Sequence, residues 1–413
     1  MSPVKNYSKQ TFFTIIIPTR ERPDTLKHAI ASVLAQDYDN FEVLVSDNAS
    51  TDDTRKIVLS LSNPKLRYIN TKKRVSMSEN WEFALNNVKN GWITVIGDDD
   101  AILPNALNYA DKIIQQTKTN AIRSNGCSYA WPKIRNSNFG ALNLHLKAGY
   151  EIRDSKIMLQ NVVNGIVSYT ELPMLYNGGF ISFDLVREAK KVSKTFFNYI
   201  APDLYSAIVF SFLTKDYVYC YEPLAINGAS HHSGGTMQFE KKRVERTYSP
   251  LLKFNRENTI PPHSDFPVTK NGFPVASIQA FVFEAFLQAK KFHNLKNIKI
   301  SYEDQIKLIL AKGGPNKKEI SDWAYKFIGM HNLKHPPYWK VVSSKIQNWI
   351  IQAPKRFKVC FETFYLQGDR NVPLANVAEA AVIGGVIKSV KPSFLKRIFA
   401  HARKLKTICM QER

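Results

Sequence analysis

Residues 11–45 read TFFTIIIPTRERPDTLKHAIASVLAQDYDNFEVLV, and this stretch decides the fold. Its first part, Thr11–Ile17, is apolar or β-branched throughout, which is typical of a buried strand. Apolar residues then recur at helical spacing after Pro23, a residue type that favours the first turn of a helix. A second apolar run, Phe41–Val45, completes a strand–helix–strand unit. Such a unit predicts parallel strands joined by a crossover helix.

The same alternation continues beyond this unit. The sequence predicts two more strands, LRYIN at residues 66–70 and WITVI at residues 92–96. Helical patterns over residues 55–61, 79–88 and 105–114 separate and follow these strands. We therefore expect an α/β fold with a mostly parallel sheet and flanking helices.

Polar clusters follow three of the predicted strands at the point where each strand ends. They are Pro18-Thr19-Arg20-Glu21, Asp47-Asn48 and Asp98-Asp99-Asp100. Open α/β sheets bind ligands at the carboxyl ends of their strands. We therefore expect one crevice to contain all three clusters.

The three consecutive aspartates pose an electrostatic problem. Adjacent carboxylates repel one another and resist burial, so a cation, a dipole or solvent must offset their charge. One interpretation is a solvated turn before the next helix. The other is a site for a hard divalent ion such as Mg²⁺ or Mn²⁺, which often accompanies a diphosphate. Neither GxxxxGK(S/T) nor a GxGxxG after the first strand is present, so a nucleotide held by a metal and by Asp47 is what remains.

The chain is long and basic, with 413 residues and a formal net charge of +22. Residues 1–240 carry 26 Lys and Arg against 23 Asp and Glu, whereas residues 241–413 carry 31 against 12. We therefore predict a nucleotide-binding, catalytic domain over 1–240 and a basic domain over 241–413. The second half shows helical patterns at residues 275–291, 303–312, 319–330 and 338–351. A basic domain attracts polyanions or an anionic membrane surface, and acceptor binding or a homo-oligomer contact are further uses for it.

The segment Phe394–Leu405 predicts a last helix with one apolar side and one basic side. This pattern is typical of an interfacial membrane helix, although a helix packed on its own domain with solvated charges has the same form. The four cysteines lie far apart, and the sequence has neither a secretory leader nor an apolar run of about 20 residues. We expect a cytoplasmic protein that contacts the inner face of the membrane.

Two segments resemble the nucleotide-sugar half of a family 2 glycosyltransferase. They are IIIPTRERPDTLKHAIASVLAQDYDNFEVLVSDNASTDDT at residues 15–54 and NWEFALNNVKNGWITVIGDDDAILPNAL at residues 80–107. The resemblance extends over about residues 11–235 and implies the GT-A fold. It also implies transfer of a sugar with inversion from a nucleotide diphosphate donor, a UDP-sugar being favoured, with Mn²⁺ or Mg²⁺ as cofactor. Bacterial members of this family often build surface polysaccharide or lipopolysaccharide on glycan or lipid-linked acceptors.

The resemblance also implies roles for particular residues. In the nucleotide-sugar site it places Pro18, Thr19, Arg20, Asp47, Arg74, Asp98 and Gly179. The metal ligands that it implies are Asp99, Asp100 and a histidine of the loop INGASHHSGGT, either His231 or His232. Gly97 replaces the first aspartate of the commoner D-x-D-D form, which leaves open which two of the three aspartates bind the metal. Asp203 is the expected catalytic base.

Alternatives stay open for Asp203 and for the whole chain. Asp203 follows Pro202 at the start of an apolar helical pattern, where an aspartate is also a good N-cap. A metal-dependent nucleotidyltransferase would share the metal and a related sheet, but its first strand should lead into a glycine- and basic-rich phosphate loop. A non-catalytic nucleic-acid-binding protein would use the basic half, but it leaves the aspartate cluster unexplained. Nucleic acid is therefore not an expected partner.

Overall fold

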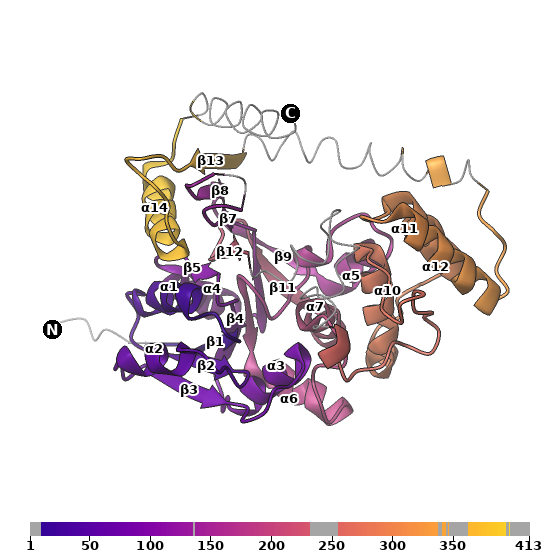
Figure 1. Ribbon diagram of the computed structural model, residues 1–413, viewed down its shortest axis with the longest axis horizontal. Coiled ribbons are helices and arrows are strands. Elements are labelled where there is room, and N and C mark those ends of the chain that lie inside the picture. Colours follow the sequence, from indigo (N-terminus) through magenta and orange to yellow (C-terminus); the bar gives the residue numbers. More distant parts are fainter. Residues whose placement is uncertain are drawn as a thin grey trace.

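The computed structural model describes residues 10–134, 137–231, 255–337, 341–343, 346, 362–393 and 396. An eight-stranded mixed sheet forms the centre of the molecule, with helices on both faces (Figure 1). Its strands follow in the order β3 (Leu66–Asn70), β2 (Phe41–Asp47), β1 (Phe13–Thr19), β4 (Trp92–Val95), β10 (Gly179–Ser182), β6 (Ala121–Ser124), β11 (Asp216–Cys220) and β9 (Tyr150–Asp154). This architecture confirms the predicted α/β class.

The central strand β1 is buried on both faces because its side chains alternate between two cores. Ile15 and Ile17 pack in one core and Ile16 packs in the other. The first core lies under α1 (Pro23–Leu34), α2 (Thr54–Ser60) and α4 (Ala106–Thr117). The second lies under α3 (Met77–Asn86), α5 (Ser155–Val163), α6 (Phe183–Val192) and α7 (Pro202–Leu213). These helices include the four predicted up to residue 114: α1 begins at Pro23 as expected, and the ends of α2, α3 and α4 are shifted by one to three residues.

Parallel pairing brings the ends of β1, β2 and β4 to one edge of the sheet. Thr19 at the end of β1 is in register with Asp47 at the end of β2. The strand β1 extends two residues past its predicted end at Ile17. The Ile16 carbonyl accepts from the Ile96 amide, so it faces β4. The nitrogen of Pro18, two residues later, faces the same side but lies beyond the end of β4. Proline fits at this position because its nitrogen has no hydrogen to donate to a neighbouring strand.

A second, five-stranded sheet joins the two halves of the chain. Its order is β13 (Thr363–Gln367), β8 (Ala141–His145), β7 (Ser128–Ala130), β12 (Ala225–Ala229) and β5 (Ala101–Ile102). The strand β13 was not predicted from the sequence, and it pairs antiparallel with β8 over its whole length. It is followed by α14 (Val377–Val390), which packs against α1 and β5 (Figure 1).

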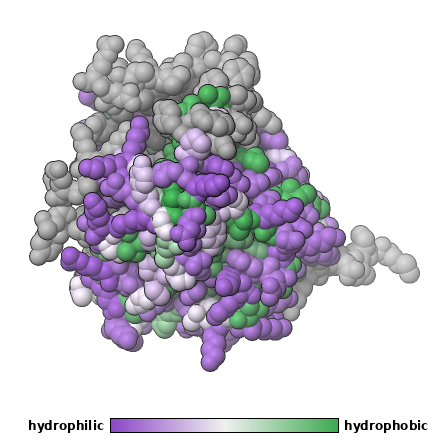
Figure 2. All heavy atoms as spheres, turned by 90° about the vertical axis from the view of Figure 1, so that its right-hand side faces the viewer, coloured by the Kyte–Doolittle hydropathy of each residue, from purple (hydrophilic) through white to green (hydrophobic). Residues whose placement is uncertain are grey.

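The rest of the described second half is helical, as predicted. It contains α10 (Ile278–Gln288), η2 (Lys290–Leu295), α11 (Tyr302–Lys312) and α12 (Lys317–Met330). The outer face formed by this helical group is mostly hydrophilic, with apolar side chains scattered over it (Figure 2). The patterns predicted at 338–351 and 394–405 fall almost entirely outside the described residues.

One hydrophobic core extends across the predicted domain boundary at residue 240. It contains Leu85 of α3, Phe210 of α7 and Phe283 of α10. The division into two domains stays a prediction, but the described parts of both halves pack directly against each other. Among the described residues, no helix is both long and apolar enough to cross a membrane.

Candidate functional site

The three polar clusters meet at the carboxyl edge of the parallel strands, as predicted. The hydroxyl of Thr19 donates a 2.8 Å hydrogen bond to Oδ2 of Asp98. The backbone N–H of Asn48 donates to the Thr19 carbonyl at 3.0 Å. The ends of β1, β2 and β4 therefore form one continuous polar surface.

Asp98 is held by an ion pair that was not predicted from the sequence. Nη1 of Arg22 lies 2.9 Å from Oδ1 of Asp98, so both carboxylate oxygens have protein partners. Burial acts to lower the pKa of Arg22, but the charges of Asp98 and Asp99 outweigh it and raise that pKa. The signal was present in the sequence, because Arg22 stands three residues after the end of β1.

Asp100 is fully buried and its carboxylate is bound by backbone amides. Gly97 donates to Oδ2 at 2.6 Å and Gly228 of β12 donates to Oδ1 at 2.7 Å. Burial, followed by the charge of Asp99, raises the pKa of Asp100 to about 8. A Cβ atom at Gly228 would lie 1.8 Å from the Asp99 carbonyl oxygen, so only glycine fits there. Asp100 thus ties the turn after β4 to the second sheet.

Asp99 contacts the loop INGASHHSGGT, in which the family resemblance implies a metal-binding histidine. Ser230 donates to Oδ2 of Asp99 at 2.5 Å, and the indole N–H of Trp131 donates to its carbonyl at 3.0 Å. His231 follows Ser230 and is exposed, whereas His232 lies outside the described residues. The loop therefore reaches the aspartate cluster, and the contact is made by Ser230.

The oxygen donors in this cluster decide what kind of metal site it can form. Among the described residues, no group of three or more His, Cys, Asp and Glu side chains is placed to hold an ion. The donor set fits an Mg²⁺- or Mn²⁺-type ion held by one or two carboxylates and by the phosphate oxygens of a substrate.

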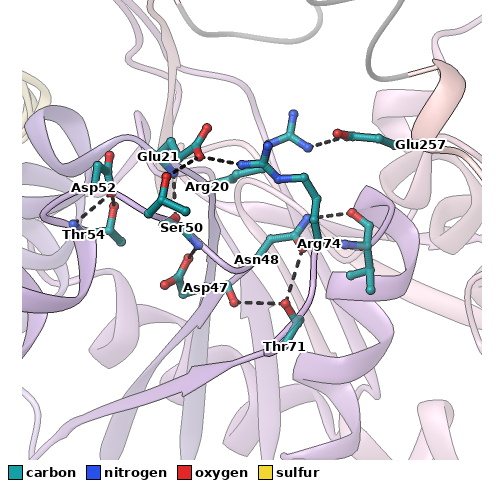
Figure 3. A network of polar contacts seen from close by, with 12 residues as sticks. Arg20, Glu21, Asp47, Asn48, Ser50, Asp52, Thr54, Thr71, Arg74 and Glu257 are labelled. Atoms are coloured by element: carbon teal, nitrogen blue, oxygen red, sulfur yellow. Dashed lines mark hydrogen bonds and ion pairs between the residues drawn. The ribbon is translucent and has the colours of Figure 1, made fainter.

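Asp47 lies below the site and organises the loop after β2 (Figure 3). It is fully buried, and its Oδ1 accepts from the Ser50 amide at 3.0 Å. Its Oδ2 accepts from the Tyr68 hydroxyl at 2.5 Å and from the Asn70 side chain at 2.9 Å. Both carboxylate oxygens thus have partners within the protein.

Two arginines stand at the mouth of the site, on different loops (Figure 3). Arg20 forms an ion pair with Glu257, which belongs to the second half of the chain. Nη2 of Arg74 lies 2.6 Å from Oε1 of Glu21. Both guanidinium groups are partly exposed, and each is paired with a glutamate near the strand ends.

Asp203 lies in the first turn of α7. The N-cap of α7 is Ala201, so the N-cap alternative for Asp203 is wrong. Burial raises the pKa of Asp203, and the Tyr169 hydroxyl donates to its Oδ2 at 3.1 Å. Burial and the charges of Asp100, Asp99 and Asp203 together raise the pKa of Tyr176. Tyr176 therefore lies within electrostatic reach of both acidic groups.

The loop that carries Tyr176 is fixed by a buried arginine. Arg123 of β6 donates to the carbonyl oxygens of Thr170 at 2.6 Å, Tyr176 at 3.0 Å and Asn177 at 2.9 Å. The loop leads into Gly179, where a Cβ atom would lie 1.7 Å from the Met174 carbonyl oxygen. Close approach of the chain's own backbone therefore accounts for this glycine, and its role at the donor sugar stays a prediction.

A family model, Glycosyl transferase family 2, matches residues 14–161. A GalNAc(5)-diNAcBac-PP-undecaprenol beta-1,3-glucosyltransferase of Campylobacter jejuni is 32% identical over 98 residues, 23% of this chain and 32% of the relative. The putative colanic acid biosynthesis glycosyl transferase WcaA of Escherichia coli is 33% identical over 110 residues, 26% of this chain and 39% of the relative. The chain thus spans only about a third of the length of these relatives.

Two solved structures show a more distant likeness. S. aureus TarS 1–349 in complex with UDP-GlcNAc has 14% identity and a TM-score of 0.44, with 84% of this chain and 92% of that chain covered. Mannosyltransferase PcManGT from Pyrobaculum calidifontis, in complex with GDP-Man and Mn²⁺, has 13% identity and a TM-score of 0.41, with 93% and 88% covered. At these identities and TM-scores, neither structure says what this chain binds.

Proposed function

The chain belongs to glycosyl transferase family 2 through residues 14–161, and on this premise we propose that it transfers a sugar from a nucleotide diphosphate donor to an acceptor hydroxyl, with inversion at the sugar carbon. A UDP-sugar is the favoured donor. The observation that carries the proposal is the position of Tyr176, which interacts with the aspartates after β4 and with Asp203. The family's donor-binding edge and a buried carboxylate therefore share one site.

Asp203 is the proposed catalytic base and takes the proton from the acceptor hydroxyl. Burial raises its pKa, which makes it a stronger base than an exposed aspartate. The hydrogen bond from Tyr169 orients the carboxylate. Because Arg123 fixes the loop on which Tyr176 lies, the wall facing Asp203 is also rigid.

The donor is proposed to lie along the carboxyl ends of β1, β2 and β4. Pro18 and Thr19 line the nucleotide pocket, and Asp47 supports it from below. Arg20 and Arg74 supply positive charge at the mouth, where guanidinium groups suit a diphosphate. In this arrangement Asp98, which Thr19 and Arg22 hold in place, faces the ribose.

A divalent ion, Mn²⁺ or Mg²⁺, is proposed to be held by Asp99 and by phosphate oxygens of the donor, with Asp98 beside it. Asp100 supports the cluster through its two backbone amides, and His231 is a further candidate ligand on the same loop as Ser230. Such an ion, when bound, stabilises the negative charge on the departing diphosphate.

The proposed acceptor is a glycan or a lipid-linked glycan of the cell surface. The name of the Campylobacter relative specifies an acceptor linked to undecaprenol diphosphate. The excess positive charge of residues 241–413 supports work beside an anionic membrane, on its inner face. The same region is available for contact with a second copy of the chain.

Thermal unfolding with and without nucleotides tests the donor site. We expect UDP with Mn²⁺ to raise the melting temperature, because a ligand at 100 times its Kd adds about 2.7 kcal/mol of stability. GDP, CDP and ADP are the controls for the base, and Asp99→Asn should remove the part of the shift that depends on Mn²⁺. No shift with any nucleoside diphosphate would contradict the proposal. Slow hydrolysis of a panel of nucleotide sugars then identifies the donor.

A further inference from the structure

A cavity of about 180 Å³ lies against the segment that leads into α7. This segment contributes Tyr199 and Ile200 to the wall, and α10 contributes Glu284. The other walls come from Asn255, residues 258–262 and residues 272–274. All of these residues lie outside 14–161, so the family match assigns nothing to the cavity.

The cavity is flanked by both parts of the proposed active site. On one side, Tyr199 stands four residues before Asp203, and the charge of Asp203 contributes, after burial and Glu284, to raising the pKa of Tyr199. On the other side, Glu257 lies in the chain between the wall residues Asn255 and Asn258, and it pairs with Arg20 of the proposed nucleotide site. The cavity wall is therefore linked to the proposed base through Tyr199, and to the loop after β1 through the chain segment that carries Glu257.

The walls offer several neutral hydrogen-bonding groups. Tyr199, Asn255, Asn258 and Thr259 carry hydroxyl or amide groups, and neither Lys nor Arg is among the described residues that line the cavity. Oδ1 of Asn255 is buried and has no hydrogen-bond partner among the described residues. A buried acceptor without a donor is costly, so this atom fits a ligand that brings a hydroxyl group.

Glu284 adds a carboxyl group that is only 1% exposed. It accepts from the Tyr199 hydroxyl at 3.2 Å and from the His263 amide at 3.2 Å. Burial raises the pKa of Glu284 to about 7, so near neutral pH the carboxyl group can donate as well as accept. Such a group suits hydroxyls, and its ionised form repels phosphates and carboxylates.

We propose that this cavity binds one neutral, polyhydroxylated unit of the acceptor, a sugar ring or an alditol, and places it beside Asp203. The inference rests on the proposed function and adds the chemical class of the acceptor unit. The volume lies below the about 300–1,000 Å³ of pockets for drug-sized ligands, which favours a single ring over a nucleotide. Pro261, Pro262 and Phe273 give the cavity stiff apolar walls for the C–H face of such a ring.

The test uses the full chain and measures binding of small probes by saturation-transfer NMR, without donor. The neutral probes are the methyl glycosides of glucose, galactose and N-acetylglucosamine, together with glycerol and ribitol; glycerol 3-phosphate is the anionic comparison. Asn255→Ala and Glu284→Gln alter opposite walls of the cavity. Glu188→Gln changes an exposed glutamate of α6 and is the matched control. Melting temperatures establish that each variant is folded.

We expect at least one neutral probe to bind the wild-type chain. Its half-saturating concentration should rise roughly threefold to tenfold in Asn255→Ala and Glu284→Gln, as loss of one or two hydrogen bonds predicts, and stay unchanged in Glu188→Gln. Three results would each overturn the inference: no neutral probe binds, both cavity variants bind like Glu188→Gln, or glycerol 3-phosphate binds most tightly. Protection by UDP is measured separately, so failure of the proposed donor site is distinguished from failure of the cavity.

Discussion

At the scale of single residues, the acidic groups of the site differ in what surrounds them. Asp100 is bound by two backbone amides, Asp98 by Arg22 and Thr19, and Asp203 by one tyrosine hydroxyl. Adjacent carboxylates of one cluster can therefore serve different purposes. Asp100 holds the turn after β4 in place through the two amides, while Asp99 and Asp203 carry the proposed chemistry.

Replacing the carboxylate of Asp203 should remove the base without disturbing nucleotide binding. We expect Asp203→Asn to lower kcat for transfer by about 10²- to 10⁴-fold, the usual contribution of a general base. Asp184→Asn is the matched control, because Asp184 also lies in the first turn of a helix but is exposed. Turnover and UDP protection are measured on both. Retained transfer in Asp203→Asn would exclude Asp203 from the mechanism.

The raised pKa of Glu284 predicts a pH-dependent stability. Its pKa is 4.5 in the unfolded reference and about 7 in the folded chain, so the folded state holds the proton more tightly between these values. The free energy of unfolding therefore falls as the pH rises from about 4.5 to about 7. Glu284→Gln lacks the titrating group, so this loss is absent. Between pH 5 and pH 8 we therefore expect the free energy of unfolding of the variant to increase, relative to that of the wild type, by up to about 3 kcal/mol.

Urea unfolding at both pH values measures this difference. Glu188→Gln, on an exposed glutamate, should follow the wild type at both. The opposite result is that the free energies of unfolding of Glu284→Gln and wild type differ by the same amount at pH 5 and at pH 8. That result would show that Glu284 titrates normally in the folded chain.

At the scale of elements, α3 shows how local sequence positions part of the site. Ser76 and Glu79 form a capping box, in which Ser76 accepts from the Glu79 amide at 3.3 Å and Glu79 accepts from the Ser76 amide at 2.8 Å. Ser78, in the first turn of α3, donates to the Tyr199 carbonyl at 2.6 Å. The cap of α3 thus also supports the wall of the cavity.

Loss of this cap should lower the free energy of unfolding by the amount that is typical of one N-cap. We expect Ser76→Ala to lower the free energy of unfolding by about 1 kcal/mol. Ser60→Ala, at the exposed end of α2, is the control and should change it by less than about 0.5 kcal/mol. Chemical denaturation of both variants gives the comparison, and equal values would mean that the capping box contributes nothing.

The elements that sequence predicts best are those whose pattern is local. Strands β1 to β4 and their helices have clear apolar periods, and parallel strand ends must meet at one edge, so the meeting of the three polar clusters was predictable. The pairing of Arg22 with Asp98, and the contact of Ser230 with Asp99, depend on how distant segments pack. The cavity beside Glu284 was not predictable at all, because its walls come from four separate segments.

The strand β13 was missed for the same reason. Its five residues, TFYLQ, are too short to give a strong period, and its partner β8 lies roughly 220 residues earlier. The two glycines that interrupt the apolar run of α14 lie against Leu103 and Pro104. They allow close packing of α14 on the segment after β5, which a single sequence does not reveal.

At the scale of the whole molecule, the last described elements, β13 and α14, pack against elements of the first half of the chain. The strand β13 completes the second sheet. Leu374, with Val377 and Ala380 of α14, is buried in a core shared with Leu103 and Leu142. Elements from both halves of the chain therefore form the second sheet and the core that support the candidate site. The basic half contributes to the stability of the first, in addition to any contact with a membrane.

Truncation after residue 361 should destabilise the whole molecule. It removes β13 and α14, and loss of the buried apolar contacts should cost at least about 4 kcal/mol. The exposed edge of β8 should also promote association. We expect calorimetry to show a melting temperature lower by roughly 10 °C and light scattering to show larger particles. Truncation after residue 393 retains both elements and is the control; if both truncations melt alike, the support is not needed.

The distance along the chain between β8 and β13 has a consequence for synthesis. At about 5–20 residues per second, the ribosome needs on the order of 10 to 40 s to add the roughly 220 residues between them. Throughout this time β8 has no partner on its outer edge. Neighbouring ribosomes on one messenger carry nascent chains with the same unpaired edge, and a finished β13 fits any of them equally well. Exchange of β13 between nascent chains is therefore the misfolding route that this topology favours.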